Sequence, residues 1–306
     1  MFATFPTFTK LTLAHKAEYE AYIKQFPPIL DLTFQSLFLW WNCFGDCAVS
    51  ILNDNLVISY TAPKDERRTG FALVGVNKVD ESICTLFDAL RALDEPVELV
   101  GVPEFVVSNI HHSEMFVLIP DRDNDEYLIS PGRYYPLENA GVYRRLRIKR
   151  FIQKHIDTQV KAGSLDLNVA ANKQLFLDSA AQWSRKGSIN NIWAPEAEVL
   201  HDSVRMSQEL DIQNVCIFMD GAVQAFCLYY YGHDRRYVNV LHVKLNTRVP
   251  LLFDYMVYGL AQWFSDHGVE YVNLDIDLGS QSLRLPKAIL GPVDFFRKYI
   301  IKPASS

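Results

Sequence analysis

The chain has 306 residues, of which 49% are hydrophobic and 22% are charged, and its formal net charge is -6. This length is enough for one large domain or two of ordinary size, and the composition is that of a soluble globular protein, which excludes a disordered chain. The negative charge argues against a protein that coats nucleic acid with its whole surface, and no DNA partner is expected. A local basic patch is still compatible with it.

No run of about eighteen apolar residues occurs, and the N-terminus lacks the basic segment, apolar core and cleavage site of a secretory signal. We therefore expect no transmembrane segment and a cytoplasmic location. None of the five cysteines has the spacing of a zinc ribbon or a disulfide scaffold. Cys43 and Cys47 lie four residues apart, but no nearby histidine or carboxylate completes a ligand set, so no metal site is expected.

The first half of the chain predicts a mixed α/β unit. A helix over residues 11–24 ends before Pro27 and Pro28, and Asp31 or Thr33 can cap a second helix. This second helix carries an apolar stripe at helical spacing, which favours a core face: Phe34, Leu37, Phe38 and Trp41. The other expected elements are strands over 47–52, 56–60, 71–76, 97–101 and 126–129, and helices over 80–93 and 103–111. Asn53, Asp54 and Asn55 predict a tight hairpin between the first two strands.

A basic helix is predicted over residues 143–156, after the turn-rich segment P-G-R-Y-Y-P. It contains six cations with no intervening acid: Arg144, Arg145, Arg147, Lys149, Arg150 and Lys154. Such a run repels itself unless something negative neutralises it. Carboxylates elsewhere on the fold and bound phosphates are both open as partners. We expect the domain boundary just before this helix, which divides the chain into residues 1–136 and 137–306.

The second half predicts two helices, a three-stranded meander, a further helix, a strand and a closing element. The expected ranges are helices over 169–186 and 196–210, strands over 215–219, 223–231 and 237–245, a helix over 250–267, a strand over 271–277 and a terminal segment over 293–301. This is the order of the GNAT acyltransferase fold. In that fold the last strand of the meander diverges from the next strand and opens a cleft for an acyl donor.

The run from Tyr271 to Lys287 alternates polar and apolar residues at first. Asn273, Asp275 and Asp277 fall on one face of the predicted strand, and valine, leucine and isoleucine fall on the other. Gly279 ends the strand, and Arg284 and Lys287 follow one helical turn apart. Two interpretations are open: this is the floor of a polar cleft, or it is an edge strand whose charges pair locally.

This run, Y-V-N-L-D-I-D-L-G-S-Q-S-L-R-L-P-K, resembles the N-x-(D/E)-x-D-x-G-x-x-x-L-R-x-x-K signature of the C-terminal catalytic domain of phosphatidylglycerol lysyltransferases and their stand-alone soluble relatives. Three more segments resemble the tyrosine-leucine strand, basic helix and early tryptophan element of that family: E-Y-L-I-S, Y-R-R-L-R-I-K-R-F-I and T-F-Q-S-L-F-L-W-W. The resemblance covers most of the chain. It implies an α/β (α+β) fold of two tandem GNAT-like domains, each with a mixed, mostly antiparallel sheet. The sequence shows no counterpart of the family's membrane-integral flippase part, so lipid modification is not implied.

The turn at residues 246–250 bears on the donor. Enzymes of the GNAT fold that use acyl-CoA usually carry a Q/R-x-x-G-x-G/A turn, whose backbone N–H groups hold the pyrophosphate. Here the turn reads N-T-R-V-P and has no glycine, so acyl-CoA is disfavoured and no cofactor is expected. The resemblance implies aminoacyl-tRNA as the donor, and Arg248 can still meet a phosphate at the start of the next helix.

Aminoacyl transfer from an ester requires positioning, a proton acceptor and stabilisation of an oxyanion. As catalytic candidates, Asp275 and Asp277 can hold an ammonium group or take a proton, and Arg284 and Lys287 can stabilise negative charge. His242 is a further catalytic candidate, although a hydrogen-bonded core histidine is the alternative interpretation. The expected donor-binding residues are Tyr143, Arg144, Arg145, Lys149, Arg150, Lys244, Arg248 and Asn273.

We therefore expect an acyltransferase of the aminoacyl-transfer type. Its acceptor would be an amine or hydroxyl of a small molecule, a lipid headgroup or a peptide. No nucleophile elbow, P-loop, dinucleotide fingerprint or zinc-protease motif supports another enzyme class. The alternative is a catalytically silent tandem module that binds an acylated ligand or a protein partner. The two differ in whether Asp277, Arg284 and Lys287 converge on an open cleft or pair with one another.

Overall fold

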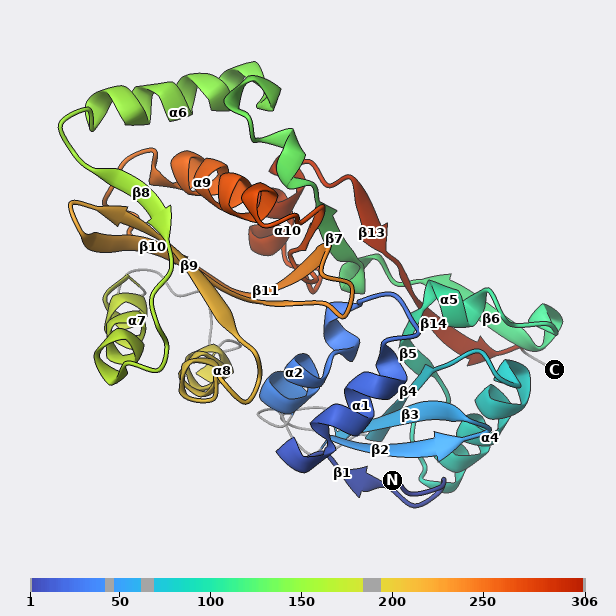
Figure 1. Ribbon diagram of the computed structural model, residues 1–306. Helices are drawn as coiled ribbons and strands as arrows, with labels where there is room; N and C mark the ends of the chain where they lie inside the picture. The colour runs from blue at the N-terminus through green and yellow to red at the C-terminus, as the bar shows by residue number, and fades with distance from the viewer. Residues whose placement is uncertain (1, 42–46, 62–68, 184–193, 305–306) are drawn as a thin grey trace. The chain divides into compact units, whose positions relative to one another are not determined.

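The computed structural model describes residues 2–41, 47–61, 69–183 and 194–304 (Figure 1). The chain forms two compact units. Unit 1 comprises Met1–Tyr127, Ile276–Ile289 and Phe295–Ser306, and unit 2 comprises Leu128–Asp275 and Leu290–Asp294. These units differ from the expected division into residues 1–136 and 137–306. The chain returns to unit 1 twice, over Ile276–Ile289 and Phe295–Ser306. Cys43, which lies four residues before Cys47 in the sequence, is outside the described residues.

Unit 1 begins with short helices and an antiparallel sheet in the order β1-β2-β3-β4. The turn between β2 and β3 places Asn53 and Asp54 at φ angles of 51° and 62°, so the predicted hairpin is confirmed. Thr33 caps the second helix, since its hydroxyl accepts the Ser36 N–H at 3.3 Å. The elements are β1 (Thr9–Lys10), a 3₁₀ turn (Leu13–His15), α1 (Lys16–Ile23), a 3₁₀ turn (Leu30–Leu32), α2 (Phe34–Ser36), a π-helical turn (Leu37–Trp41), β2 (Cys47–Leu52), β3 (Asn55–Thr61) and β4 (Thr69–Val74).

The core of unit 1 forms around α4 (Val79–Ala92). Ile83, Leu86 and Leu90 recur at helical spacing and are buried against Val57 and Leu73 of the sheet, so the predicted helix is confirmed. A second sheet has the order β5-β14-β6, in which β14 pairs antiparallel with both neighbours. This pairing explains why the end of the chain returns to unit 1. The elements are β5 (Leu99–Pro103), α5 (Glu104–Val107), β6 (Phe116–Pro120), a 3₁₀ turn (Arg122–Asn124), α10 (Gln281–Ile289) and β14 (Lys298–Pro303).

Unit 2 is organised on a sheet in the order β13-β7-β12-β11-β10-β9-β8. Strands β8 to β11 are antiparallel, and β12 runs parallel to β11 and antiparallel to β7. The division between the units passes through β7 and β13. The strands are β7 (Glu126–Ile129), β8 (Val160–Gly163), β9 (Gln213–Met219), β10 (Ala222–Tyr231), β11 (Tyr237–Leu245), β12 (Tyr271–Asn273) and β13 (Asp294–Phe296).

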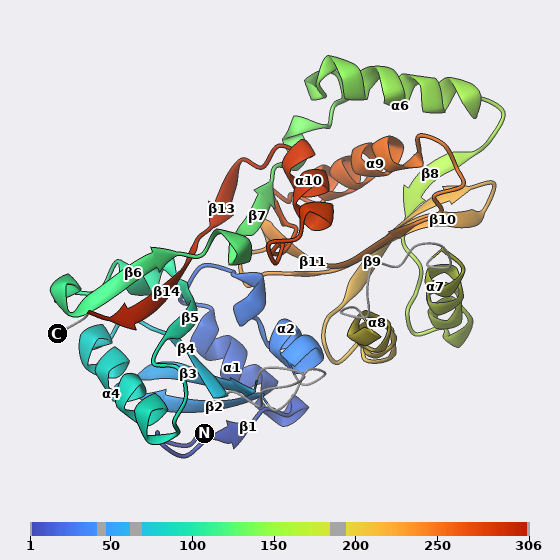
Figure 2. The same ribbon diagram turned by 180° about the vertical axis from the view of Figure 1, so that it is seen from behind.

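Helices cover both faces of this sheet (Figures 1 and 2). On one face, Phe264 of α9 packs with Cys227 and Val238, and α6 lies beside α9 through a stack of Phe151 on Tyr255 at 4.6 Å. On the other face, α7 packs through Phe176 against β10, and α8 covers β11. The helices are α6 (Val142–Lys154), α7 (Ala170–Trp183), α8 (Ala194–Arg205) and α9 (Leu252–Asp266).

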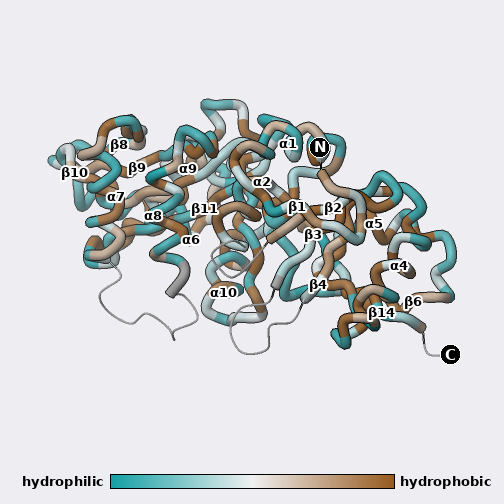
Figure 3. Tube along the Cα trace, turned by 90° about the horizontal axis from the view of Figure 1, so that it is seen from below, coloured by the Kyte–Doolittle hydropathy of each residue, from teal (hydrophilic) through white to brown (hydrophobic). Residues whose placement is uncertain are grey.

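Each unit runs through a meander, a helix and a further strand. In unit 1 these are β2-β3-β4, α4 and β5, and in unit 2 they are β9-β10-β11, α9 and β12. The expected fold of two tandem GNAT-like domains with mixed, mostly antiparallel sheets is therefore confirmed. The hydropathy of the trace alternates along the elements of both units, as expected where each element has one buried side (Figure 3). Among the described residues, no helix has both the length and the apolar character required to cross a membrane.

The prediction of a strand over residues 271–277 was wrong in its length. It ends at Asn273, because the Asn273 side-chain oxygen accepts the Asp275 N–H at 2.9 Å and turns the chain. Asp275 and Leu278 then adopt φ angles of 68° and 52°. Asp277 is fully buried, whereas the Leu278 side chain is 52% exposed, so the predicted polar and apolar faces do not continue to the end of this run.

Candidate functional site

Asp277 lies at the centre of a hydrogen-bonded cluster in unit 1, just before α10. Its carboxylate is fully buried and accepts the Arg284 Nε–H at 2.8 Å and a second Arg284 N–H at 2.7 Å, one on each oxygen. The Tyr127 hydroxyl donates to the same carboxylate at 2.5 Å, and the Gly279 N–H donates at 2.9 Å. The two-point contact with Arg284 is the strong geometry for an arginine and a carboxylate.

Two more residues of unit 1 extend this cluster. Arg284 also donates to Asp123 at 2.5 Å, and Arg122 donates to the Tyr127 hydroxyl at 2.7 Å. Gly279 has a φ of 70°, and a Cβ at this position would lie 2.7 Å from an Asp123 oxygen. The glycine of the signature is therefore required both by its backbone conformation and by the close approach of Asp123.

The pKa of Asp277 reflects two opposing effects. Burial alone raises it, but hydrogen bonds from Arg284, Tyr127 and Gly279 outweigh burial and lower the pKa from 3.8 to about 2. A carboxylate with so low a pKa, already saturated with donors, is a weak proton acceptor at neutral pH. Asp277 is thus suited to holding Arg284 and Tyr127 in place.

Lys287 belongs to the same cluster. The Lys287 ammonium group donates to the Ile276 carbonyl and lies 5.8 Å from the centre of the Tyr127 ring. Asp277, Arg284 and Lys287 are therefore gathered around Tyr127 in unit 1. Asp275 and Asn273 belong to unit 2, where both lie at or just after the end of β12.

A second polar group lies on β11 of unit 2, on the sheet face that α8 covers. His242 is buried, and its Nε2 lies 3.4 Å from the Ser203 hydroxyl of α8. Burial lowers the pKa of His242 to about 3, so the ring is neutral near pH 7. Lys244 forms an ion pair with Glu196 at 2.6 Å. Asn239 is the register partner of Asn273, is fully buried, and has no hydrogen-bond partner for either side-chain atom among the described residues.

The cations of α6 have different surroundings. Arg147 forms an ion pair with Asp254 of α9 at 2.6 Å, and Arg144 lies over the Tyr134 ring at 5.1 Å. Lys149 and Arg150 are exposed, as is Lys154 at the end of the helix. Within the described part of the chain, Arg147 is the one cation of this helix with a carboxylate partner. Internal pairing therefore accounts for one charge of the run.

The turn after β11 uses its own backbone donors. The Arg248 N–H donates to the Asn246 side-chain oxygen at 3.1 Å, and the Val249 N–H donates to the Asn246 carbonyl at 3.1 Å. The Asn246 amide is held in turn by Gln224 at 2.9 Å. The N–H groups of a phosphate-binding loop converge on one point, whereas these two N–H groups donate to two different oxygens of Asn246.

The sequence patterns missed Arg122, Asp123 and Tyr127 of the Asp277 cluster. Tyr127 is part of the E-Y-L-I-S segment, so the family resemblance gave a signal for the strand but not for its role. Arg122 and Asp123 carried no local signal, because they lie about 150 positions from the carboxylate and arginine that they contact. Asn239 and Ser203 were missed because they meet Asn273 and His242 only through strand pairing and helix packing, which the local sequence does not show.

A match to a family model shows to which protein family this chain belongs. The model described as "Phosphatidylglycerol lysyltransferase, C-terminal" matches residues 34–301. The chain belongs to this family. No curated protein matches it. This lysyltransferase-family chain contains the signature Asp277, Gly279, Arg284 and Lys287 within the matched range.

Two solved structures show the same fold. A conserved protein of unknown function from Bacteroides thetaiotaomicron VPI-5482 is 19% identical, with a TM-score of 0.78 over 97% of this chain and 99% of that one. The L-PGS of Bacillus licheniformis is 12% identical, with a TM-score of 0.54 over 86% of this chain and 85% of that one. Family and fold together support acyl transfer of the aminoacyl type.

Proposed function

We propose that this chain transfers an aminoacyl group from aminoacyl-tRNA to an amine or hydroxyl acceptor. The observation that carries the choice of donor is the outer surface of α6, where Lys149, Arg150 and Lys154 are exposed. Exposed cations without carboxylate partners on an acidic protein suit the phosphates of a nucleic acid. We propose further donor-binding residues on the same helix and after β11. They are Tyr143, Arg144 and Arg145 on the helix and Arg248 after the strand.

The proposed chemistry divides the signature residues by role. We assign Asp277 to positioning, because its carboxylate is buried and already accepts four hydrogen bonds. The Arg284 side chain is 28% exposed, so it can stabilise negative charge while it stays anchored to Asp277. Lys287 supports the same region as a second cation.

Proton handling is assigned to Asp275, which can also hold an ammonium group. Burial lowers the pKa of His242 to about 3, so its ring is a weak proton acceptor, and we assign it the acceptance of a hydrogen bond that orients the attacking amine or hydroxyl. Asn273 and Lys244 are proposed as donor-binding residues beside them. No cofactor is proposed, because the 246–250 turn has its backbone donors occupied and contains no glycine.

A donor-consumption assay tests this proposal. The protein is incubated with a total tRNA pool charged with labelled amino acids, and in parallel with acetyl-CoA and longer acyl-CoAs, each with and without a mixture of candidate amines and hydroxyl compounds. We expect accelerated loss of at least one aminoacyl-tRNA and no loss of acyl-CoA. The matched control is the Asp275→Asn variant with His242→Gln, which should bind tRNA and consume little of it. Loss of acyl-CoA alone would contradict the choice of donor, and loss of neither would favour a silent binding module.

A further inference from the structure

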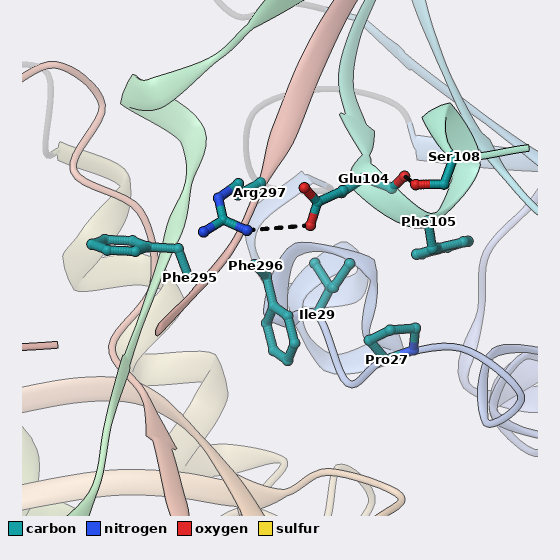
Figure 4. A pocket seen from close by; sticks show the side chains of 8 residues that line it. All are labelled: Pro27, Ile29, Glu104, Phe105, Ser108, Phe295, Phe296 and Arg297. Carbon is teal, nitrogen blue, oxygen red and sulfur yellow. Dashed lines mark hydrogen bonds and ion pairs between the residues drawn. The ribbon is translucent and has the colours of Figure 1, made fainter. Parts of the chain in front are cut away.

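Unit 1 contains a cavity of about 220 Å³ between the start of α5 and the end of β13 with the following Arg297 (Figure 4). Its apolar walls come from Pro27, Ile29, Phe105 and Phe296. Glu104 and Arg297 point toward one another above these rings, so the cavity has an apolar floor and one acid-base pair at its edge (Figure 4). Its volume is below the roughly 300–1,000 Å³ of sites for drug-sized ligands, so a ligand of single amino-acid size fits it better.

The two charged residues of this cavity are joined by a backbone hydrogen bond and by a long contact between their side chains. The Glu104 N–H donates to the Arg297 carbonyl at 3.0 Å, which fixes the separation of the two residues. Their side chains meet at 3.5 Å and remain 46% and 50% exposed. An exposed pair at this distance contributes little to stability, so a ligand can replace the contact between these two side chains at low cost.

Two of the rings that line the cavity pack against neighbouring rings. Phe105 stacks on Phe26 at 4.8 Å with an interplanar angle of 11°. Phe295, at the side of the cavity, meets the Tyr127 ring edge-on at 5.0 Å, and Arg122 lies 4.9 Å from the centre of each of these two rings. Tyr127 and Arg122 belong to the Asp277 cluster. One wall of the cavity therefore contacts the Asp277 cluster of this same unit.

We propose that this cavity binds a zwitterionic α-amino acid with an apolar side chain. The Glu104 carboxylate would accept hydrogen bonds from the α-ammonium group, and the Arg297 guanidinium would bind the α-carboxylate at two points. The apolar side chain would lie against Phe105 and Phe296, where burial of its surface adds affinity. The site is independent of the proposed aminoacyl transfer, because binding requires no donor.

Calorimetry and ligand-observed NMR with defined probes test the site. L-phenylalanine and L-leucine should bind saturably, whereas phenethylamine, which lacks the carboxylate, and 3-phenylpropionate, which lacks the ammonium group, should each bind roughly tenfold or more weakly. L-lysine should also bind weakly, because its second ammonium group would have to enter the apolar floor.

Two variants separate the roles of the charged residues. Glu104→Gln should remove the preference for L-phenylalanine over 3-phenylpropionate, and Arg297→Gln should remove the preference over phenethylamine. Lys302→Gln, an exposed change on the following strand β14, is the matched control and should bind as the original protein does. The proposal is overturned if no probe binds saturably, if the three phenyl compounds bind equally, or if both cavity variants match the control. Should a variant fail to fold, the ligand series on the unchanged protein still decides the outcome.

Discussion

Arg284 donates one hydrogen bond to each carboxylate oxygen of Asp277, at 2.8 and 2.7 Å. The two residues lie seven positions apart, at the start of α10 and in the turn before it. Arg284 donates at the same time to Asp123, so one guanidinium joins the turn, the helix and a distant part of unit 1. The signature therefore acts as a structural unit in addition to any contact with substrate.

Asp277→Asn should destabilise the protein by about 3 kcal/mol, because a buried charged pair loses one partner and Arg284 keeps its charge. Urea unfolding measures this change. Asp275→Asn is the control, since asparagine tolerates the same left-handed backbone, and it should cost much less. The double variant Asp277→Asn with Arg284→Met should lose less unfolding free energy than the sum of the losses of the two single variants, because the two residues are in direct contact. Strictly additive effects would contradict the coupling.

Local patterns in the sequence predicted those elements whose residues contact near neighbours. The Asn53-Asp54 turn and the buried face of α4 were predicted because backbone conformation and helical spacing are local properties. The strand beyond Asn273 was predicted wrongly, because the side chain of Asn273 competes for the Asp275 N–H and alternation alone does not reveal this. The alternation also hid the burial of Asp277, which depends on partners about 150 positions away.

The signature residues of the candidate site could be predicted, but their grouping could not. Family resemblance pointed to Asp277, Arg284 and Lys287, and these three share unit 1. No local pattern indicated that Asp275, two positions before Asp277, belongs to unit 2. The return of β14 between β5 and β6 is equally invisible locally, because a strand order depends on pairings far along the chain.

Lys298→Met should destabilise the protein by about 3–5 kcal/mol, because it leaves the fully buried Glu126 without its cation. Lys298 is 2% exposed, donates to Glu126 at 2.9 Å and also donates to Asp31. Lys302→Met on the same strand is the control. Its side chain is 47% exposed and pairs with Glu98 at 2.8 Å, so its loss should cost about 1 kcal/mol or less. Thermal and urea unfolding of both variants checks the difference. Equal stability of the two would show that the buried network contributes no more than a surface pair.

Stability should fall as the pH drops below about 6.5, in part because of His242. Burial lowers the pKa of this residue from 6.5 to about 3 in the folded protein. Between these two pH values the unfolded chain binds a proton at His242 and the folded chain does not. The loss should approach about 1.4 kcal/mol per pH unit and continue down to about pH 3.

Urea unfolding between pH 7 and 4.5 measures this dependence, since Asp277 begins to contribute only near pH 4. His242→Gln should flatten the profile. His201→Gln is the control, because His201 is 57% exposed on neighbouring α8, and it should leave the profile unchanged. A profile that both substitutions leave unaltered would contradict the buried neutral state of His242.

Acetyl-CoA and free CoA should bind weakly to this protein. The N–H groups of Arg248 and Val249 already donate within the 246–250 turn, so they cannot form a cradle for pyrophosphate without breaking those bonds. Isothermal titration at protein concentrations of tens of micromolar should give no stoichiometric heat. Substituting glycine at Thr247 and Val249 tests whether the turn is the obstacle, and this variant should bind CoA more tightly than the original protein does. Tight binding of CoA at a ratio of one would overturn the prediction.

Neutralising the outer cations of α6 should weaken tRNA binding and reduce its dependence on salt. Lys149→Gln with Arg150→Gln removes two exposed charges, and each lost phosphate contact should lower the salt slope by about 0.7–0.9. Lys78→Gln with Arg91→Gln is the matched control, because it removes two exposed helix-associated charges from unit 1, at 64% and 53% exposure. Filter binding between 50 and 200 mM salt compares the two.

Arg147→Gln should behave differently from both double variants, since it breaks the ion pair with Asp254. It should lower the melting temperature more than it lowers the tRNA affinity. If the α6 and control variants lose the same affinity, general charge and not a track on α6 attracts the tRNA. If the original protein shows no salt-dependent binding at all, the basic helix has another partner, and the proposed donor is wrong.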